Sequence, residues 1–119
     1  MLINVSNHPS ARWGEAQHQA AVAAYGSIRD LPFPQIDPHW GLDEVEMEAE
    51  RYLGEICRAE PFALAVHLMG ELVFCYILAR KLEAIGIPCV ASTTVREVID
   101  HGDGRKEAQF RFVRFRPYF

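Results

Sequence analysis

Three short polar runs carry the side chains best suited to chemistry. The first is Ser6-Asn7-His8-Pro9-Ser10, with Trp13 three residues further on; the second is His67-Leu68-Met69-Gly70-Glu71; the third is Ser92-Thr93-Thr94, with Arg96 close behind. Hydroxyls, amides, imidazoles and backbone N–H groups bind phosphate or a nucleobase, and an indole ring stacks on a base. These residue types therefore indicate a ligand that carries phosphate.

Each polar run directly follows a segment that is expected to be a β-strand. The central one is residues 62–66, whose five apolar residues without alternation indicate a strand buried on both faces. A strand at Leu2–Val5 precedes the first polar run, and a strand at Ile87–Ala91 precedes the third. A weaker strand at Ser27–Leu31 contains Arg29 and Asp30 and fits the edge of a sheet.

Helices are expected between these strands. They span about Trp13–Tyr25, closed by Gly26; Leu42–Arg58, with an acidic solvated face; and Glu71–Ile85, closed by Gly86. After the fourth strand this alternation stops, and the segments Val95–Ile99 and Ala108–Phe115 flank an Asp-Gly turn signal typical of a hairpin. The apolar alternation of the last strand slips by one residue at Val113, which predicts a β-bulge there.

The expected fold is a single α/β domain over residues 1–119. It is a three-layer sandwich whose parallel sheet has strand order 2-1-3-4 and is extended by the C-terminal β-hairpin. Ligands in such sheets bind beyond the carboxyl ends of the strands, at the switch point between the first and third strands. The three polar runs should meet there, and the expected ligand-binding residues are Ser6, Asn7, Ser10, Trp13, Met69, Gly70, Glu71, Ser92, Thr93 and Thr94.

Composition narrows the class of protein. The net charge of −4 and the sequence pI near 5.7 argue against binding of long duplex nucleic acid. Cys57, Cys75 and Cys89 have no metal-binding spacing and are expected to be small buried hydrophobes in a reducing compartment. Neither a signal peptide nor a membrane span is indicated, so we expect a cytoplasmic protein.

Each polar run also has a structural interpretation. Ser10 could cap the first helix, His67 could be a packed core histidine, and Glu71 is favoured near a helix start by the helix dipole alone. His67 and Glu71 do not share a helical face, so no helical metal site is predicted, although His8 and His67 could meet in space. No acid stands at a strand end to orient a histidine, so no Ser-His-Asp triad and no cofactor are predicted.

In these three motifs the chain resembles the small CRISPR-associated Rossmann-fold proteins, the single-domain CARF-like and ring-nuclease-like family. The resemblance covers nearly the whole chain. It implies a Rossmann-like homodimer that binds a cyclic oligoadenylate second messenger in antiviral defence, sometimes cleaving it without metal through attack of a ribose 2′-hydroxyl on the adjacent phosphate. By this resemblance, His8, His67 and Arg96 are the candidate catalytic residues; the absence of lysine from the three runs departs from what cleavage would favour.

Two other functions stay open from the sequence. One is an enzyme that acts on another phosphorylated or acyl substrate through His8 and His67. The other is a protein-interaction module without a small ligand. The first half of the segment 71–85 is apolar almost all the way round, so we expect that surplus apolar side to meet a second copy of the chain in a homodimer.

Overall fold

Five strands form one sheet in the computed structural model, which describes all 119 residues. The strands are β1 (Leu2–Ser6), β2 (Ile28–Asp30), β3 (Ala65–Met69), β4 (Cys89–Asp100) and β5 (Lys106–Pro117). Their spatial order is β2-β1-β3-β4-β5, with the first four parallel and β5 antiparallel to β4. The predicted α/β class, the strand order 2-1-3-4 and the C-terminal hairpin are thus confirmed.

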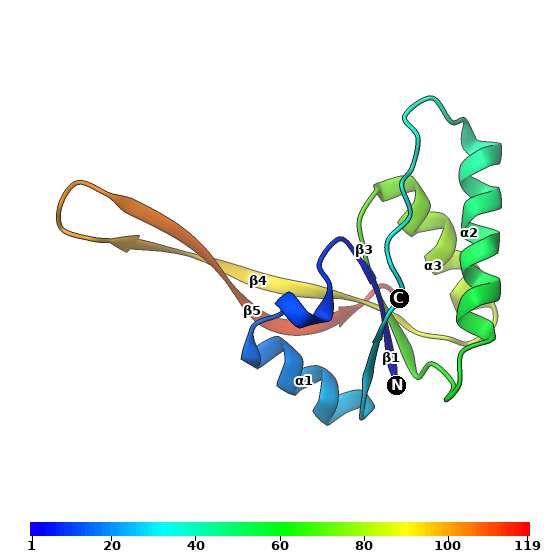
Figure 1. Ribbon diagram of the computed structural model, residues 1–119, viewed down its shortest axis with the longest axis horizontal. Helices are drawn as coiled ribbons and strands as arrows, with labels where there is room; N and C mark the ends of the chain where they lie inside the picture. Colours follow the sequence, from blue (N-terminus) through cyan, green and yellow to red (C-terminus); the bar gives the residue numbers. More distant parts are fainter.

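Helices cover both faces of the sheet (Figure 1). Helix α1 (Glu15–Tyr25) lies on one face, which we call the α1 face, and α2 (Leu42–Cys57) and α3 (Leu72–Ala84) lie on the other, the α2–α3 face. Alternation along the strands divides the core accordingly: Leu2 packs with Ala21 of α1, whereas Ile3 and Val5 pack with α2 and α3. None of the helices combines the length and apolar character needed to cross a membrane.

The larger core lies on the α2–α3 face. Phe74 of α3 is fully buried there, and its ring meets those of Phe33 and Tyr52 edge to face, with centroids 5.3 and 5.4 Å away. The α1 face has a smaller apolar cluster, completed by half-buried Trp13 and Phe115. The smaller cluster adjoins the buried polar residues of β1 and β3.

Helix ends follow the glycine signals closely. Gly26 and Gly86 take φ values of +85° and +82°, a conformation that favours glycine, directly after α1 and α3. The start of α1 differs from prediction because Ser10–Arg12 form a separate short 3-10 helix, η1, and Trp13 is extended. Gly14, and not Ser10, therefore occupies the N-cap of α1.

The central strand begins later than the sequence indicated. β3 starts at Ala65 because Leu2, the first residue of β1, pairs with Ala65. Phe62 and Leu64 are 81% and 56% exposed, so the prediction that residues 62–66 form the buried strand was wrong at its first residues. The shift places His67 and Met69 inside β3 rather than in the following loop.

The fourth strand also differs, since Ser92-Thr93-Thr94 do not end it. β4 runs unbroken to Asp100 because β5 pairs with it along its whole length. Thr93 pairs with Arg114 and Thr94 with Phe112, so Val113 is the extra residue and the predicted bulge is confirmed. Cys57, expected to be buried, is exposed because it lies on the last turn of α2.

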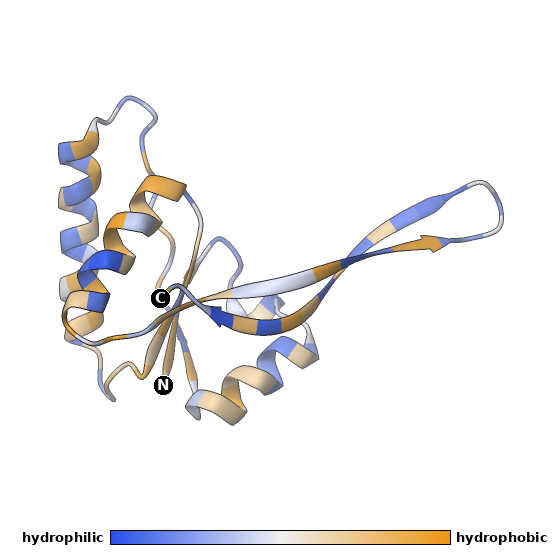
Figure 2. Cartoon of the chain, turned by 180° about the vertical axis from the view of Figure 1, so that it is seen from behind, coloured by the Kyte–Doolittle hydropathy of each residue, from blue (hydrophilic) through white to orange (hydrophobic).

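Beyond the body of the molecule β4 and β5 continue as a two-stranded arm, which we define as residues 93–117. Its root, residues 115–117, pairs with residues 90–92, and Phe115 packs against Tyr25 of α1. Beyond the root the arm projects away from all three helices and gives the molecule a longest dimension of 51 Å (Figures 1 and 2). Hydrophobic and hydrophilic residues are interspersed along it (Figure 2). The polar residues at the start of β4 are therefore also the root of this arm.

Candidate functional site

Asn4 is the centre of a buried polar network on the α1 face. Its Nδ2 donates hydrogen bonds to the carbonyl oxygen of His8 (2.9 Å) and to Oδ1 of Asp30 (2.8 Å). Its Oδ1 accepts from Oγ of Ser6 and from Nδ1 of His67, both at 2.8 Å. Both the nitrogen and the oxygen of the Asn4 side-chain amide are hydrogen-bonded, and only 2% of the residue's surface is exposed. Asn4 therefore fixes the relative positions of four segments of the chain.

Sequence reasoning missed Asn4 because it stands inside the strand Leu2–Ser6. One signal was present, since a single amide interrupts an otherwise apolar run that is buried on both faces. The ladder explains how this polar residue is tolerated: Asn4 pairs directly with His67 across the β1–β3 register. Each polar side chain therefore supplies the hydrogen bond that the other needs.

His67 lies between Asn4 and Ser92 and is 2% exposed. Its Nδ1 is 2.8 Å from Oδ1 of Asn4, and its Nε2 is 2.7 Å from Oγ of Ser92. Because Nδ2 of Asn4 already donates to other groups, the hydrogen-bond network assigns the ring proton to Nδ1 and makes Nε2 the acceptor of the Ser92 hydroxyl. His67 can thus act on a ligand only through Ser92, and is a positioning residue.

The environment of His67 keeps its ring neutral. Burial, with a smaller contribution from the nearby His8, lowers the pKa of His67 from 6.5 to about 4. The rings of Trp13 and Phe115 pack edge-on against it, with centroids 5.1 and 5.7 Å away. A neutral imidazole with a free lone pair on Nε2 is the form that accepts a proton from a hydroxyl.

Ser92 is the half-buried end of this network. Its Oγ donates to His67 and accepts a hydrogen bond from Nε2 of Gln17 (2.9 Å), and its backbone N–H faces Sδ of Met69 (3.3 Å). Serine, histidine and an orienting amide stand in the order of a nucleophile, a base and its positioning group. In a Ser-His-Asp triad an acidic residue orients the histidine; in this chain Asn4 occupies that position.

Hydrogen bonds to the buried residues beneath it fix the conformation of the loop between β1 and α1. Nδ2 of Asn4 and Nε1 of Trp13 both donate to the carbonyl oxygen of His8, the latter at 3.0 Å. The backbone N–H and hydroxyl of Ser10 donate to the carboxylate of Asp30 at 3.0 and 2.8 Å. Partial burial alone would raise the pKa of Asp30, but hydrogen bonds from Asn4 and Ser10 outweigh it and lower the pKa below its usual value.

Three polar or charged side chains of this loop are exposed to solvent. They are Asn7, His8 and Arg12. The ring of His8 makes no hydrogen bond within the chain, and Arg12 makes no ion pair. An arginine at this position was not among the predicted site residues. The fixed backbone therefore presents an amide, an imidazole and a guanidinium at the carboxyl edge of the sheet.

The loop between β3 and α3 is explained largely by its own packing. A Cβ atom added to Gly70 would lie 2.2 Å from Cζ of Phe33, so the close approach that favours glycine is to this ring. The carboxylate of Glu71 accepts hydrogen bonds from the backbone N–H groups of Val73 (3.0 Å) and Phe74 (2.7 Å). An anion at the start of α3 would have to displace this N-cap.

An open groove lies on the α2–α3 side of the same edge. Its volume is about 290 Å³, and it is lined by Met69, Gly70, Leu72, Cys75, Tyr76, Ala91 and Tyr118. Arg116 pairs with Ala91 and Arg114 with Thr93, so both arginines share this face of the sheet. Burial raises the pKa of the Cys75 thiol to about 12, which makes this cysteine a poor nucleophile.

The structure thus divides the predicted residues into three groups. The first is joined by the network on the α1 face: Ser6, His8, Ser10, Trp13, His67 and Ser92, with exposed Asn7 beside them in the same loop. Met69 and Gly70 line the groove on the α2–α3 face, Glu71 borders a different pocket, beside Trp40, and Thr93 donates a hydrogen bond to the carbonyl oxygen of Arg114. Thr94 and Arg96 lie on the arm, and Arg96 is four residues beyond Ser92, which is about 13 Å along a strand.

These features place the chain in a structural class. The chain is a mixed α/β protein whose mostly parallel five-stranded sheet carries a hydrogen-bonded polar network at its carboxyl edge. No group of three histidine, cysteine or acidic side chains converges to hold a metal ion. The chain belongs to the uncharacterized protein MJ1673 family, whose model matches residues 1–116. No curated protein and no solved structure matches it.

Proposed function

We propose that this protein binds a phosphate-bearing nucleotide at the carboxyl edge of a Rossmann-like sheet, and that the nucleotide is a cyclic oligoadenylate sensed in a CRISPR-linked antiviral response. The observation that supports this most is the network around Asn4 and His67. It fixes the β1–α1 loop before any ligand arrives, so binding requires little ordering of the chain. The carboxyl edge is where ligands bind in sheets of this topology.

The ligand is recognised by exposed groups around this edge. Arg12 and the amide of Asn7 contact phosphate, while Ser92 offers a hydroxyl whose orientation His67 and Gln17 fix. Met69 lies beside Ser92, with its Sδ 3.3 Å from the Ser92 backbone N–H, so its sulfur contacts the face of a nucleobase bound at this edge. Arg114 and Arg116 lie on the groove side and neutralise phosphates that extend toward the arm.

Cleavage of the ligand is a second step that this site can support. A ribose 2′-hydroxyl attacks the adjacent phosphate and its proton passes to a base. The bond to the 5′-oxygen breaks as that oxygen takes up a proton, which leaves a 2′,3′-cyclic phosphate end and a 5′-hydroxyl end. His8 is the exposed imidazole available as acid or base, whereas His67 acts through Ser92. Arg96 is too far along the arm to share a contact with Ser92, and contributes through longer-range attraction of the anion.

Thermal-shift measurement against cyclic and linear oligoadenylates of several lengths tests this proposal. A ligand that binds only the folded chain at 100 times its Kd adds about 2.7 kcal/mol to the free energy of unfolding. Arg12→Ala and His8→Ala should lose most of the shift, and Arg96→Ala should lose less. His18→Ala, an exposed histidine on α1, is the matched control that should keep it. No shift with any oligoadenylate would refute the proposal.

The Ser92–His67–Asn4 arrangement supports one further candidate, an enzyme that acts on another phosphorylated or acyl substrate. Here the Ser92 oxygen bonds to the acyl carbon or phosphorus of an ester while His67 accepts the hydroxyl proton. His67 then passes this proton to the alcohol oxygen as its bond to the substrate breaks; Nε2 and Nδ1 of His67 are 2.7 Å from Ser92 and 2.8 Å from Asn4. Steady turnover of simple esters or phosphate esters that Ser92→Ala abolishes, together with no response to oligoadenylates, would favour this function. Thr93→Ala, one residue along on the opposite face, should leave the turnover unchanged.

A further inference from the structure

The arm exposes apolar side chains that nothing in the chain covers. Phe110 is 69% exposed, Val98 53% and Val113 52%. Phe110 and Phe112 point to the same face as Phe115, because the bulge at Val113 restores the alternation. An isolated two-stranded ribbon is marginally stable in water, and this one continues far beyond the helices (Figure 1). A second surface is therefore needed to stabilise the arm.

The body has a matching uncovered surface at the start of α3. Leu72 is 80% exposed and Tyr76 59%, and they line the apolar groove with Met69 and Ala91. The opposite side of α3, with Phe74 and Leu78, is buried in the core. The helix therefore has two apolar sides and only one of them has a partner within the chain.

Charge separates the arm from the body. Residues 93–117 carry six basic and four acidic side chains, a net charge of +2, whereas the other residues carry six basic and twelve acidic ones, a net charge of −6. Contact between two bodies would bring like net charges together, whereas an arm that approaches a body brings opposite net charges together; the groove itself is lined by uncharged residues.

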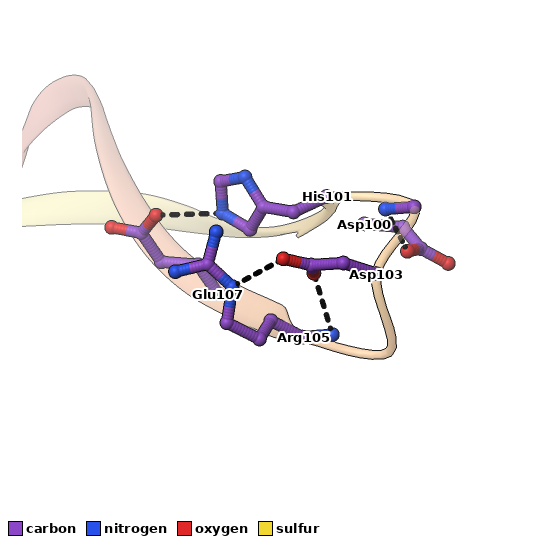
Figure 3. A network of polar contacts seen from close by, with 6 residues as sticks. Asp100, His101, Asp103, Arg105 and Glu107 are labelled. Carbon is purple, nitrogen blue, oxygen red and sulfur yellow. Dashed lines mark hydrogen bonds and ion pairs between the residues drawn. The ribbon is translucent and has the colours of Figure 1, made fainter.

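The tip of the arm does not supply this positive charge. At the tip Nε of Arg105 is 2.8 Å from Oδ2 of Asp103, and Nε2 of His101 is 3.1 Å from Oε2 of Glu107 (Figure 3). Arg111 is paired in the same way with Glu97 along the shaft. Four basic residues of the arm have no ion pair within the chain: Arg96, Arg114 and Arg116 lie on the shaft and root, and Lys106 lies beside the turn.

The outer part of the arm cannot reach its own α3 surface, because it projects away from the body (Figure 1). We propose that two copies of the chain exchange arms, each arm lying along the α3 groove of the other copy about a two-fold axis. About eight residues of shaft span about 26 Å, enough to cover the roughly 20 Å of a thirteen-residue helix. A two-fold axis closes the assembly at two copies, since both arms and both grooves are then occupied.

Sedimentation of single variants gives the first test, and it does not depend on any ligand. The unmodified chain should sediment as a dimer at micromolar concentration, while Phe110→Asp on the arm and Tyr76→Asp in the groove should each sediment as monomers. Phe62→Asp is the control, because Phe62 is 81% exposed in the loop before β3 and should leave the dimer intact. Circular dichroism of each variant checks that the fold is retained.

Mixing the two monomeric variants identifies the exchange itself. The Phe110→Asp chain keeps a functional groove and the Tyr76→Asp chain keeps a functional arm, so a mixture restores one of the two contacts. We expect the mixed pair to associate at least tenfold more tightly than either variant with itself. Arm-to-arm pairing would instead leave Tyr76→Asp dimeric, and contact between two α3 helices would leave Phe110→Asp dimeric; either result overturns the proposal.

A monomeric unmodified chain would also overturn it. In that case a single-stranded oligonucleotide provides a useful second probe, because the arm interleaves arginine with phenylalanine. Binding of the oligonucleotide that Phe110→Asp abolishes would assign the arm to nucleic acid and not to a second copy. Binding that survives in this variant would remove the arm from that role as well.

Discussion

The body and the arm satisfy their polar groups in different ways. In the body, Asn4, Ser6 and His67 are buried and bonded to one another, and no buried side-chain nitrogen or oxygen atom lacks a partner. In the arm, ion pairs such as Arg105–Asp103 are exposed and lie between neighbours in the hairpin. A buried network whose groups are all hydrogen-bonded stabilises the fold strongly, and removing one partner lowers the stability markedly. Exposed ion pairs contribute only about 0–1 kcal/mol to the free energy of unfolding.

This difference has a functional meaning. A rigid, prearranged network suits a site that must hold a small ligand with little reorganisation, and the body has such a network at its carboxyl edge. A long exposed ribbon suits contact with a large surface, because its stability rises when that surface is supplied. Equivalent substitutions in the two regions should therefore have unequal effects.

The largest contrast is expected between two phenylalanines. Phe74→Ala removes a fully buried ring that packs against Phe33 and Tyr52, and should lower the free energy of unfolding by about 3–5 kcal/mol. Phe110→Ala removes an exposed ring of the arm and should change the free energy of unfolding of the isolated chain by less than about 0.5 kcal/mol. Urea denaturation at low protein concentration measures both, and equal losses would place the arm in the same cooperative unit as the core.

Acidification should distinguish the two regions by their histidines. The pKa of His67 is about 4 in the folded chain and 6.5 in the unfolded one, so the unfolded state binds the proton more readily between these values. Stability should fall as the pH drops from 6.5 toward 4, by about 3 kcal/mol in total. His67→Gln should flatten this dependence, while His101→Gln on the arm should leave it unchanged; identical slopes in all three proteins would contradict this account.

A smaller effect is expected at Gly70. Gly70→Ala places a methyl group against the ring of Phe33 and should cost about 1–3 kcal/mol of stability. Phe33→Ala in the same chain should remove this penalty, so the two substitutions should be strongly non-additive in a double-mutant cycle. Additive losses would show that the ring and the glycine do not compete for the same space.

The smallest effects compare two glycines of like conformation. Gly86 and Gly104 have φ values of +82° and +87°, and an added Cβ would meet no atom within 4 Å in either case. Gly86→Ala should lower global stability by about 1 kcal/mol. Gly104→Ala should carry the same local strain but accelerate amide exchange only in the arm. A fall in global stability from Gly104→Ala would again join the two regions.

Local patterns predicted the helices, the strand order and the bulge, because these depend on the spacing of apolar residues and on glycine. They failed at β3 and β4, where the outcome depends on the length of a neighbouring strand. Phe62 falls outside β3 because β1 begins only at Leu2, and Ser92 stays within β4 because β5 continues alongside it. The sequence of a single strand does not show how long its neighbouring strand will be.

The candidate site, like the fold, was predictable only where it depends on local sequence patterns. The loop residues Ser6, His8 and Ser10 were found because they follow a strand, and the network does join them to His67 and Ser92. Asn4 was missed because its role depends on a partner 63 residues away. Glu71 and Gly70 were singled out correctly as unusual, but the carboxylate caps α3 and the glycine accommodates Phe33.

The bulge at Val113 also restricts how the length of the arm can change. Because one unpaired residue in β5 keeps Phe112 and Phe115 on one side, pairing Val113 into a regular ladder would turn the outer part of β5 over and exchange its apolar and polar faces. Insertions at the turn between Asp100 and Lys106 carry no such consequence, provided that they lengthen both strands equally. Related chains with longer or shorter ribbons should therefore differ at the turn, and those with an extra residue near the root should keep it in a bulge.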